Sequence, residues 1–160
     1  MTKKKKNDFL LIGVALILLG GLLIFSIATR VKGEIAYVKV SNQAVMQISL
    51  KDGSYVANNP SNVIVLTEKP EIDGFDLTTS SEVIPLEFGK TIVVYQNLFY
   101  VRGALGVVEI QYKENKIRVS KEKSPYNICS RQGYSDVAPI VCLPNFVTIE
   151  FSNDTDVIIG

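Results

Sequence analysis

Histidine and tryptophan are both absent from this 160-residue chain. Without histidine, the sequence excludes Ser-His-Asp and Cys-His catalysis, histidine-ligated metal sites and a histidine pH switch. The chain has two cysteines, Cys129 and Cys142, which do not form a CxxC motif. No other catalytic, cofactor-binding or metal-binding motif is recognisable in the sequence. We therefore predict a protein that is not an enzyme and that needs no cofactor or metal.

Charge is distributed unevenly along the chain. Lys3 to Lys6 form a basic cluster, whereas from Gly33 onward 11 Lys and Arg stand against 15 Asp and Glu, a net charge of −4. A mildly acidic body is poorly suited to follow the phosphates of a nucleic acid, so no nucleic-acid partner is expected. Basic and acidic residues also alternate between Glu109 and Lys123, which indicates a mixed surface rather than an anion site.

One acidic stretch resembles a calcium loop only in composition. Its members are Glu68, Glu71, Asp73 and Asp76. An EF-hand needs oxygen ligands at alternate positions, a central glycine and a distal glutamate, and this spacing does not supply them. The stretch is interpreted as a solvated loop. A glycosidase-type carboxylate pair depends on distance in space, which spacing alone does not reveal.

The one long hydrophobic run is Phe9 to Ala28, 20 residues without a charge. As a helix rising about 1.5 Å per residue it would span roughly 30 Å, the hydrocarbon thickness of a bilayer. The run therefore predicts a transmembrane anchor. A cleaved signal peptide, with Ser26 and Ala28 before the cleavage site, is the alternative, although its hydrophobic region is usually about 7–15 residues long.

The charges that flank this run predict its orientation. Four lysines precede it, and only Arg30 and Lys32 follow it before the first acidic residue of the body. The positive-inside rule then places the N-terminus in the cytoplasm and the body outside the membrane. The predicted organisation is a cytoplasmic basic tail at residues 1–8, an anchor at 9–28 and an extracytoplasmic domain at 33–160.

After residue 33, the pattern changes to short alternating apolar and polar runs separated by Gly, Pro, Asn and Ser, which is typical of strands and tight turns. Turns are expected at residues 41–43, 51–54, 96–97, 113–115 and 144–145. A short helix is expected at 124–132, because Ser124 is a good N-cap, Pro125 suits the first helical position and Gly133 suits the end. The predicted fold class is mainly β, a small β-sandwich or barrel-like domain with one short helical turn after the N-terminal transmembrane helix.

Three states are open for Cys129 and Cys142. In an oxidising compartment they would form a structural disulfide that closes a 14-residue loop and stabilises the fold by about 3 kcal/mol. They could also be buried free thiols, or a redox-active pair, in which case the nearby Arg131 would favour a thiolate at Cys129.

The C-terminal third combines Cys129 and Gln132-Gly133 with the run Val141 to Asn145. Together with the N-terminal segment, this combination resembles the NusG domain II-containing proteins, small exported proteins with a membrane anchor and one β-rich domain. That domain is similar to an insert domain of some NusG transcription factors. The residues that match the family motif are Gln132, Gly133, Cys142, Leu143, Pro144 and Asn145. Each also has a structural explanation in a turn or strand.

Two departures from the family pattern limit what the resemblance implies. Ser124 stands where family members commonly have a further cysteine, so no role for three cysteines is carried over. Residues 57–103 are longer than the family's usual connection and are interpreted as an insertion of unknown purpose.

The leading hypothesis is a non-enzymatic, membrane-tethered extracytoplasmic β-domain, a protein-interaction or accessory module for a protein partner at the membrane surface. Two alternatives stay open. One is a redox or electron-transfer accessory using Cys129 and Cys142, because some relatives accompany flavin-based electron transfer at the cell surface. The other is a cell-envelope-binding structural module that contacts its target through residues 57–103.

Overall fold

The computed structural model describes residues 3–28 and 32–153. The chain divides into two compact units, residues 1–31 and 32–160. Arg30, whose charge contributes to the predicted orientation of the anchor, lies outside the described residues.

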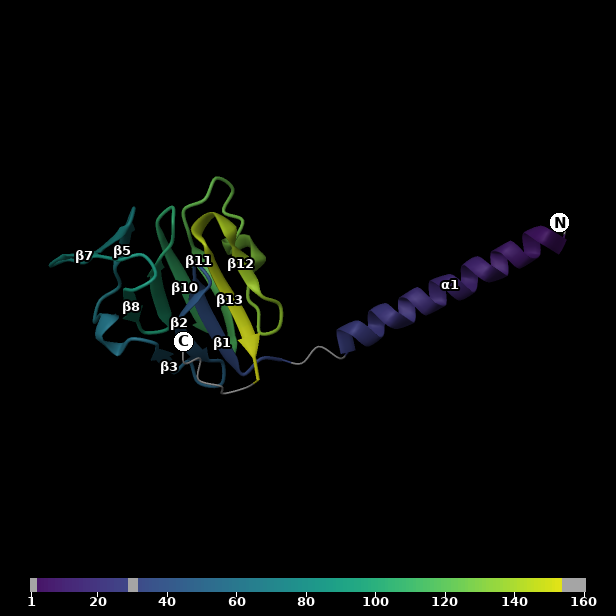
Figure 1. Ribbon diagram of the computed structural model, residues 1–160, viewed down its shortest axis with the longest axis horizontal. Coiled ribbons are helices and arrows are strands. Elements are labelled where there is room, and N and C mark those ends of the chain that lie inside the picture. Colours follow the sequence, from purple (N-terminus) through teal and green to yellow (C-terminus); the bar gives the residue numbers. More distant parts are fainter. Residues whose placement is uncertain (1–2, 29–31, 154–160) are drawn as a thin grey trace. The chain divides into compact units, whose positions relative to one another are not determined.

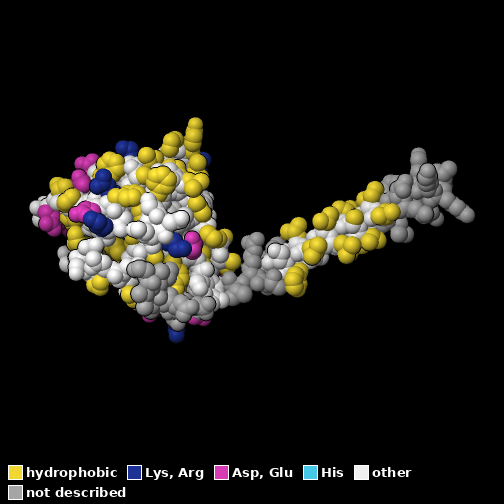
Figure 2. Space-filling model, in the orientation of Figure 1, with side chains coloured by type: hydrophobic (Ala, Val, Ile, Leu, Met, Phe, Trp, Pro, Cys, Tyr) yellow, Lys and Arg dark blue, Asp and Glu magenta, His cyan; other side chains and the backbone are white. Residues whose placement is uncertain are grey.

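The first unit contains one α-helix, α1 (Lys3–Ala28), which includes the whole uncharged run and the basic cluster before it. The side chains described in α1 are those of residues 11–26; almost all are apolar and most are exposed (Figure 2). Among the described residues, we find no helix with the combination of length and hydropathy that crossing a membrane requires.

The second unit is mainly β, as predicted, and its strands form two five-stranded sheets and one three-stranded sheet (Figure 1). The strands are β1 (Ile35–Val40), β2 (Gln43–Ser49), β3 (Tyr55–Ala57), β4 (Val63–Val65), β5 (Glu71–Asp73), β6 (Asp76–Thr78), β7 (Val83–Pro85), β8 (Ile92–Tyr95), β9 (Leu98–Arg102), β10 (Val107–Lys113), β11 (Lys116–Lys121), β12 (Ile140–Cys142) and β13 (Val147–Ser152). Three 3₁₀ turns, η1 (Pro60–Asn62), η2 (Ser130–Gln132) and η3 (Leu143–Asn145), connect them.

The two five-stranded sheets share one hydrophobic core. Their strand orders are β12-β13-β1-β2-β3 and β11-β10-β9-β8-β4, and neither closes on itself among the described strands. Val38 and Met46 from the first sheet belong to the same buried cluster as Phe99 and Ile110 from the second. Full burial of each such side chain stabilises the fold by about 1.5–3 kcal/mol relative to its exposure. The alternating pattern therefore determines which face of each sheet is inside.

Residues 57–103 do not form one separate insertion. Within this stretch, β4, β8 and β9 complete the second sheet, and β9 contributes Phe99 to the core. Only β5, β6 and β7 form a sheet of their own, at the edge of the domain away from β12 and β13 (Figure 1). Leu77 and Ile84 of this small sheet share a second hydrophobic cluster with Val93 and Tyr100, which lie on the outer face of β8 and β9. The predicted insertion thus includes strands that the fold needs.

The prediction of a helix at residues 124–132 is wrong. Only η2 forms there, and Ser124 does not cap it, since its buried hydroxyl has no hydrogen-bond partner within the described part of the chain. The Glu122 carboxylate accepts the N–H groups at the start of the turn instead. Gly133 does end the turn, with φ of 76°. A tertiary contact from Glu122 therefore replaces the expected local cap.

The turn between β2 and β3 depends on Asp52. The Ser54 hydroxyl and the Ser54 backbone N–H donate to Asp52 Oδ1 at 2.7 and 3.0 Å. The Ser54 hydroxyl first, then the Ser49 side chain and the Ser54 backbone N–H, lower the pKa of Asp52 from 3.8 to about 2. Because the folded pKa lies below the unfolded one, the carboxylate stabilises the fold at neutral pH. This contribution disappears as the pH falls from about 4 towards 2.

We therefore expect the stability advantage of the wild type over Asp52→Asn to shrink over that pH range. Urea unfolding of both proteins from neutral pH down to about pH 2 measures it. A difference in unfolding free energy that does not change with pH would show that the Asp52 charge has no part in the turn.

Candidate functional site

Four side chains meet at one corner of the domain. Glu122 follows β11, Cys129 precedes η2, Cys142 ends β12 and Asn145 ends η3. We call these four residues the disulfide corner. Both cysteines and Asn145 are buried, and Glu122 is half-buried. The corner therefore joins the long connection after β11 to the last two strands.

Cys129 and Cys142 form a disulfide bond, with Cα atoms 5.1 Å apart. Their exposed fractions are 1% and 0%. The structure therefore has the bonded form, which two of the states open from the sequence share, the structural disulfide and the redox-active pair, rather than two free thiols. The bond attaches η2 to β12 and is enclosed by the fold.

Glu122 directs its carboxylate at this bond. Oε1 accepts the backbone N–H of Cys129 at 2.6 Å and that of Ser130 at 3.2 Å. Oε2 lies 3.2 Å from the Cys142 Sγ. The Asn145 Nδ2 donates to this same Oε2 at 3.4 Å. One oxygen is thus held by the backbone while the other faces sulfur. The alternation of charges around Glu122 predicts a mixed surface, and no motif spacing points to this position.

Asn145 connects three segments from inside the protein. Its Nδ2 donates to the carbonyl oxygen of Lys123 at 3.1 Å, and its Oδ1 accepts the N–H of Leu105 at 3.1 Å. Nδ2 also lies 3.5 Å from the Cys142 Sγ. The side chain fits because Gly103 has no Cβ, which would lie 2.6 Å from the Asn145 Cβ. The asparagine of the motif therefore holds the corner together.

Gln132 closes the outer edge of β12. Its Nε2 donates to the carbonyl oxygen of Val141 at 2.9 Å, and its Oε1 accepts the Val141 N–H at 3.2 Å. The amide thus replaces a neighbouring strand at an otherwise open sheet edge. Gly133, the next motif residue, has a positive φ that a side chain would strain.

Two large apolar side chains project at the η3 turn, where Leu143 is the first residue, Pro144 the second and Phe146 the residue that follows the turn. Leu143 is 72% exposed and Phe146 is 58% exposed. Phe146 adopts the left-handed conformation with φ of 53°, and its carbonyl oxygen accepts the N–H of Ser41 at 2.9 Å. Together with Thr148, these residues line a pocket of about 240 Å³. The turn therefore displays Leu143 and Phe146 on a well-defined backbone.

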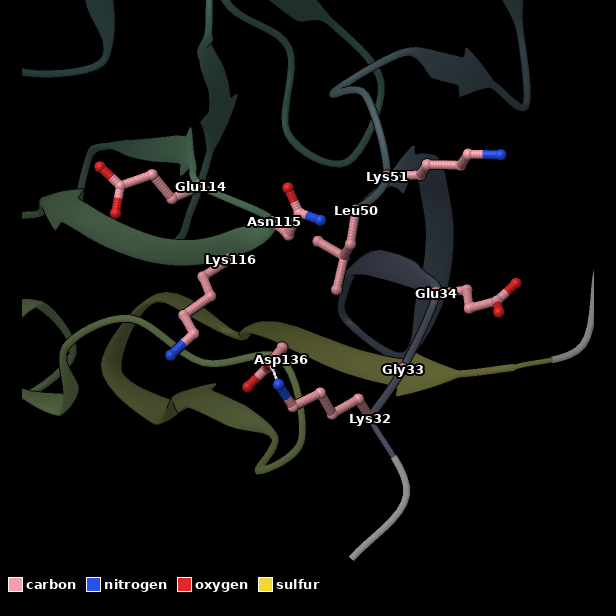
Figure 3. A pocket seen from close by; sticks show the side chains of 9 residues that line it. All are labelled: Lys32, Gly33, Glu34, Leu50, Lys51, Glu114, Asn115, Lys116 and Asp136. Atoms are coloured by element: carbon pink, nitrogen blue, oxygen red, sulfur yellow. Dashed lines mark ion pairs between the residues drawn. The ribbon is translucent and has the colours of Figure 1, made fainter.

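A pocket of about 550 Å³ lies among the start of β1, the β2–β3 turn, the β10–β11 turn and the loop before β12. Lys32 and Lys116 are directed toward Asp136, while the other charged side chains point outward (Figure 3). The Lys32 Nζ lies 3.9 Å from the Asp136 Oδ2. Basic and acidic side chains balance around this pocket, so it does not select for an ion of one sign.

Glu109 is a buried acid in the second sheet, only 4% exposed and opposite Tyr100 on the neighbouring strand. The Ser120 hydroxyl donates to its Oε1 at 2.7 Å, while its Oε2 and the Tyr100 hydroxyl have no hydrogen-bond partner among the residues described. Burial, and next the Glu109 charge, raises the pKa of Tyr100, so the phenol stays protonated. In the sequence, the only indication of the pair formed by Glu109 and Tyr100 is that Glu109 lies within the largely apolar run at residues 105–112.

The acidic stretch interpreted as a solvated loop is partly strand, because Glu71 and Asp73 lie in β5 and Asp76 lies in β6. Glu68 accepts the backbone N–H and the hydroxyl of Ser80 at 2.7 and 2.8 Å, which lowers its pKa. Asp73 and Asp76 are paired across the turn between β5 and β6. In the described ranges, the metal-ligating side chains that do converge are Glu122, Cys129 and Cys142, whose ligand atoms lie within 4.8 Å of one another.

Comparison with known proteins identifies the family. The family model NusG domain II matches residues 55–155, a range that includes the second sheet, the three-stranded sheet and the disulfide corner. No curated protein and no solved structure matches the chain. The resemblance seen in the motif at Gln132-Gly133 and Cys142 to Asn145 is confirmed, and the chain belongs to the NusG domain II family.

Proposed function

We propose that this protein is a membrane-tethered, extracytoplasmic β-domain that binds a protein partner at the membrane surface. The observation that supports binding is the η3 turn, where Leu143 and Phe146 are both exposed and line the same pocket. A single exposed apolar side chain needs no explanation, whereas an apolar patch on a fixed turn suits contact with another protein. The disulfide corner keeps this turn in place.

Support for the tether comes from the sequence. The run Phe9 to Ala28 contains no charge and, as a helix, matches the thickness of a bilayer. Its terminal side chains, those of Phe9, Leu10, Ile27 and Ala28, are outside the set that the structure describes. The preceding lysines favour a cytoplasmic N-terminus. A disulfide in the body suits an oxidising compartment outside the cytoplasm.

The redox-accessory alternative has less support from the geometry. Thiol–disulfide exchange needs an accessible sulfur and a stabilised thiolate. Cys129 and Cys142 are enclosed, and the neighbouring Glu122 carboxylate would oppose a negative charge on Cys142. A contact module is therefore the better-supported function.

Topology is tested by adding one cysteine at a time to the full chain. Ser81 is exposed on the domain, and Thr2 lies before the anchor. We expect a membrane-impermeant maleimide to label Ser81→Cys in intact cells and Thr2→Cys only after permeabilisation, while the wild type stays unlabelled. Labelling in the opposite order, or release of the domain into the medium, would contradict the tether.

Partner binding is tested by photo-crosslinking in cells. A photo-reactive residue at Phe146 is expected to give one discrete crosslinked product, and Leu143→Asp should abolish it. Val83, 62% exposed on β7, is the matched control position and should give no such product. A product that forms equally from Val83, or that persists in Leu143→Asp, would show that the η3 turn is not the contact surface.

A further inference from the structure

We propose that, once its disulfide is reduced, the disulfide corner binds one divalent cation of borderline softness, such as Zn²⁺, through Cys129, Cys142 and Glu122. Two thiolates and a carboxylate are ligands that Zn²⁺ accepts in proteins. The three ligand atoms already lie within 4.8 Å of one another. This inference is independent of the proposed contact with a partner.

The distances fit a tetrahedral site. With Zn–S near 2.3 Å and Zn–O near 2.0–2.2 Å, two sulfur ligands lie about 3.8 Å apart and a sulfur and an oxygen about 3.5 Å apart. Glu122 Oε2 is already 3.2 Å from the Cys142 Sγ. Reduction lets the two sulfurs separate by side-chain rotation, while the Cα atoms, 5.1 Å apart, need little movement.

Hydrogen bonds from neighbouring groups orient the Glu122 carboxylate toward the sulfurs. The backbone N–H groups of Cys129 and Ser130 bind Oε1, so Oε2 is the oxygen left to face the sulfurs. The Asn145 Nδ2 points at both Oε2 and the Cys142 Sγ, at 3.4 and 3.5 Å. Hydrogen bonds of this kind orient metal ligands and support the charge on a thiolate.

Charge balance explains why a cation would stay. Reduction by a phosphine transfers two electrons to the disulfide, while water supplies two protons to the sulfurs and its oxygen to phosphorus. The products are two thiols and the phosphine oxide. Binding of Zn²⁺ then releases both thiol protons and neutralises two of the three negative charges of the ligands. Without the cation, three anions in an enclosed corner would be costly. The disulfide and the metal-bound form are therefore mutually exclusive states of one site.

Residues of the corner line two surface pockets. Glu122 lines one of about 340 Å³ together with Lys121 and Lys123, and Cys142 lines the pocket of about 240 Å³ that Phe146 also lines. Three protein ligands leave one of four zinc positions for water, which is the arrangement of an open rather than a closed site.

The test is a titration of the full chain with Zn²⁺ alone, before and after treatment with a phosphine reductant. We expect one equivalent to bind the reduced protein and none to bind the oxidised protein. Co²⁺ in place of Zn²⁺ should give a thiolate-to-cobalt absorption band. Glu122→Gln should weaken binding at least about 10-fold, and Cys142→Ser should abolish the band. Glu114→Gln, at an exposed turn carboxylate, is the matched control and should bind as the wild type does.

Two results of the titration would decide against the site. Absence of binding to the reduced, folded protein would overturn it, as would stoichiometric binding that survives both Glu122→Gln and Cys142→Ser. If reduction unfolds the domain, circular dichroism measures whether Zn²⁺ restores the folded state. Recovery of the β-sheet signal with one equivalent of Zn²⁺ supports the site, and failure to recover it overturns the proposal.

Discussion

The double variant Cys129→Ala/Cys142→Ala is expected to unfold with a free energy about 3 kcal/mol below that of the oxidised wild type. The bond closes a loop with a sequence separation of 13. In the chain-entropy model, such a loop removes about that much conformational freedom from the unfolded chain. Urea unfolding measures the loss directly, and thermal unfolding should show a decrease of roughly 10 °C.

Treatment with a reductant distinguishes the stability contributed by the disulfide bond from that contributed by the packing of the two cysteine side chains. In a buffer that contains a chelator, reduction should lower the stability of the wild type but leave the double variant unchanged. A double variant within about 1 kcal/mol of the oxidised wild type would mean that the loop is already held by other contacts. The Gln132 amide on Val141 and the backbone pairing of Ile117 with Ser135 would then be those contacts.

The hairpins of this fold could be predicted because their signals are local. Alternation in β11 and β13 marks the buried face of each strand, and the turn residues Gly53 and Asn115 adopt the positive φ that such turns need. The pairing of β1 with β13 has no local signal, since Val38 and Ile149 come from opposite ends of the domain. The strands β5, β6 and β7 have three residues each, too few for a periodic pattern.

The sequence motif identifies Cys129, Cys142 and Asn145 of the corner, but it does not identify Glu122, whose carboxylate contacts all three. Cys129, Cys142 and Asn145 stand in a recognisable frame, whereas Glu122 lies seven residues before the first cysteine between two lysines. That context is typical of a solvated surface. The carboxylate turns inward because it accepts the N–H groups of Cys129 and Ser130, and only the tertiary structure shows this. The incorrect helix prediction at residues 124–132 and the failure to identify Glu122 thus have the same cause, a cap supplied by tertiary structure rather than by Ser124.

Asn145→Ala is expected to destabilise the domain by about 3 kcal/mol. The variant removes the bonds to the Lys123 carbonyl and the Leu105 N–H, worth about 1 kcal/mol each, and leaves a cavity in a fully buried position. Asn58→Ala is the matched control, because that exposed asparagine also donates to a backbone carbonyl, at 2.6 Å. Urea unfolding should show a loss below about 1 kcal/mol there.

Asn145→Asp distinguishes hydrogen bonding from simple filling of space. The aspartate has the same shape, but it loses the donor to the Lys123 carbonyl and places a second negative charge within about 3.4 Å of the Glu122 carboxylate. We expect this variant to be at least as unstable at neutral pH as Asn145→Ala, because an unpaired charge in an enclosed position is costly. An Asn145→Asp protein as stable as the wild type would show that the corner needs only the volume of this side chain. A severe loss would show that a side chain of the same shape is not sufficient, because the corner needs the neutral Nδ2 donor that faces the Lys123 carbonyl and the Glu122 carboxylate.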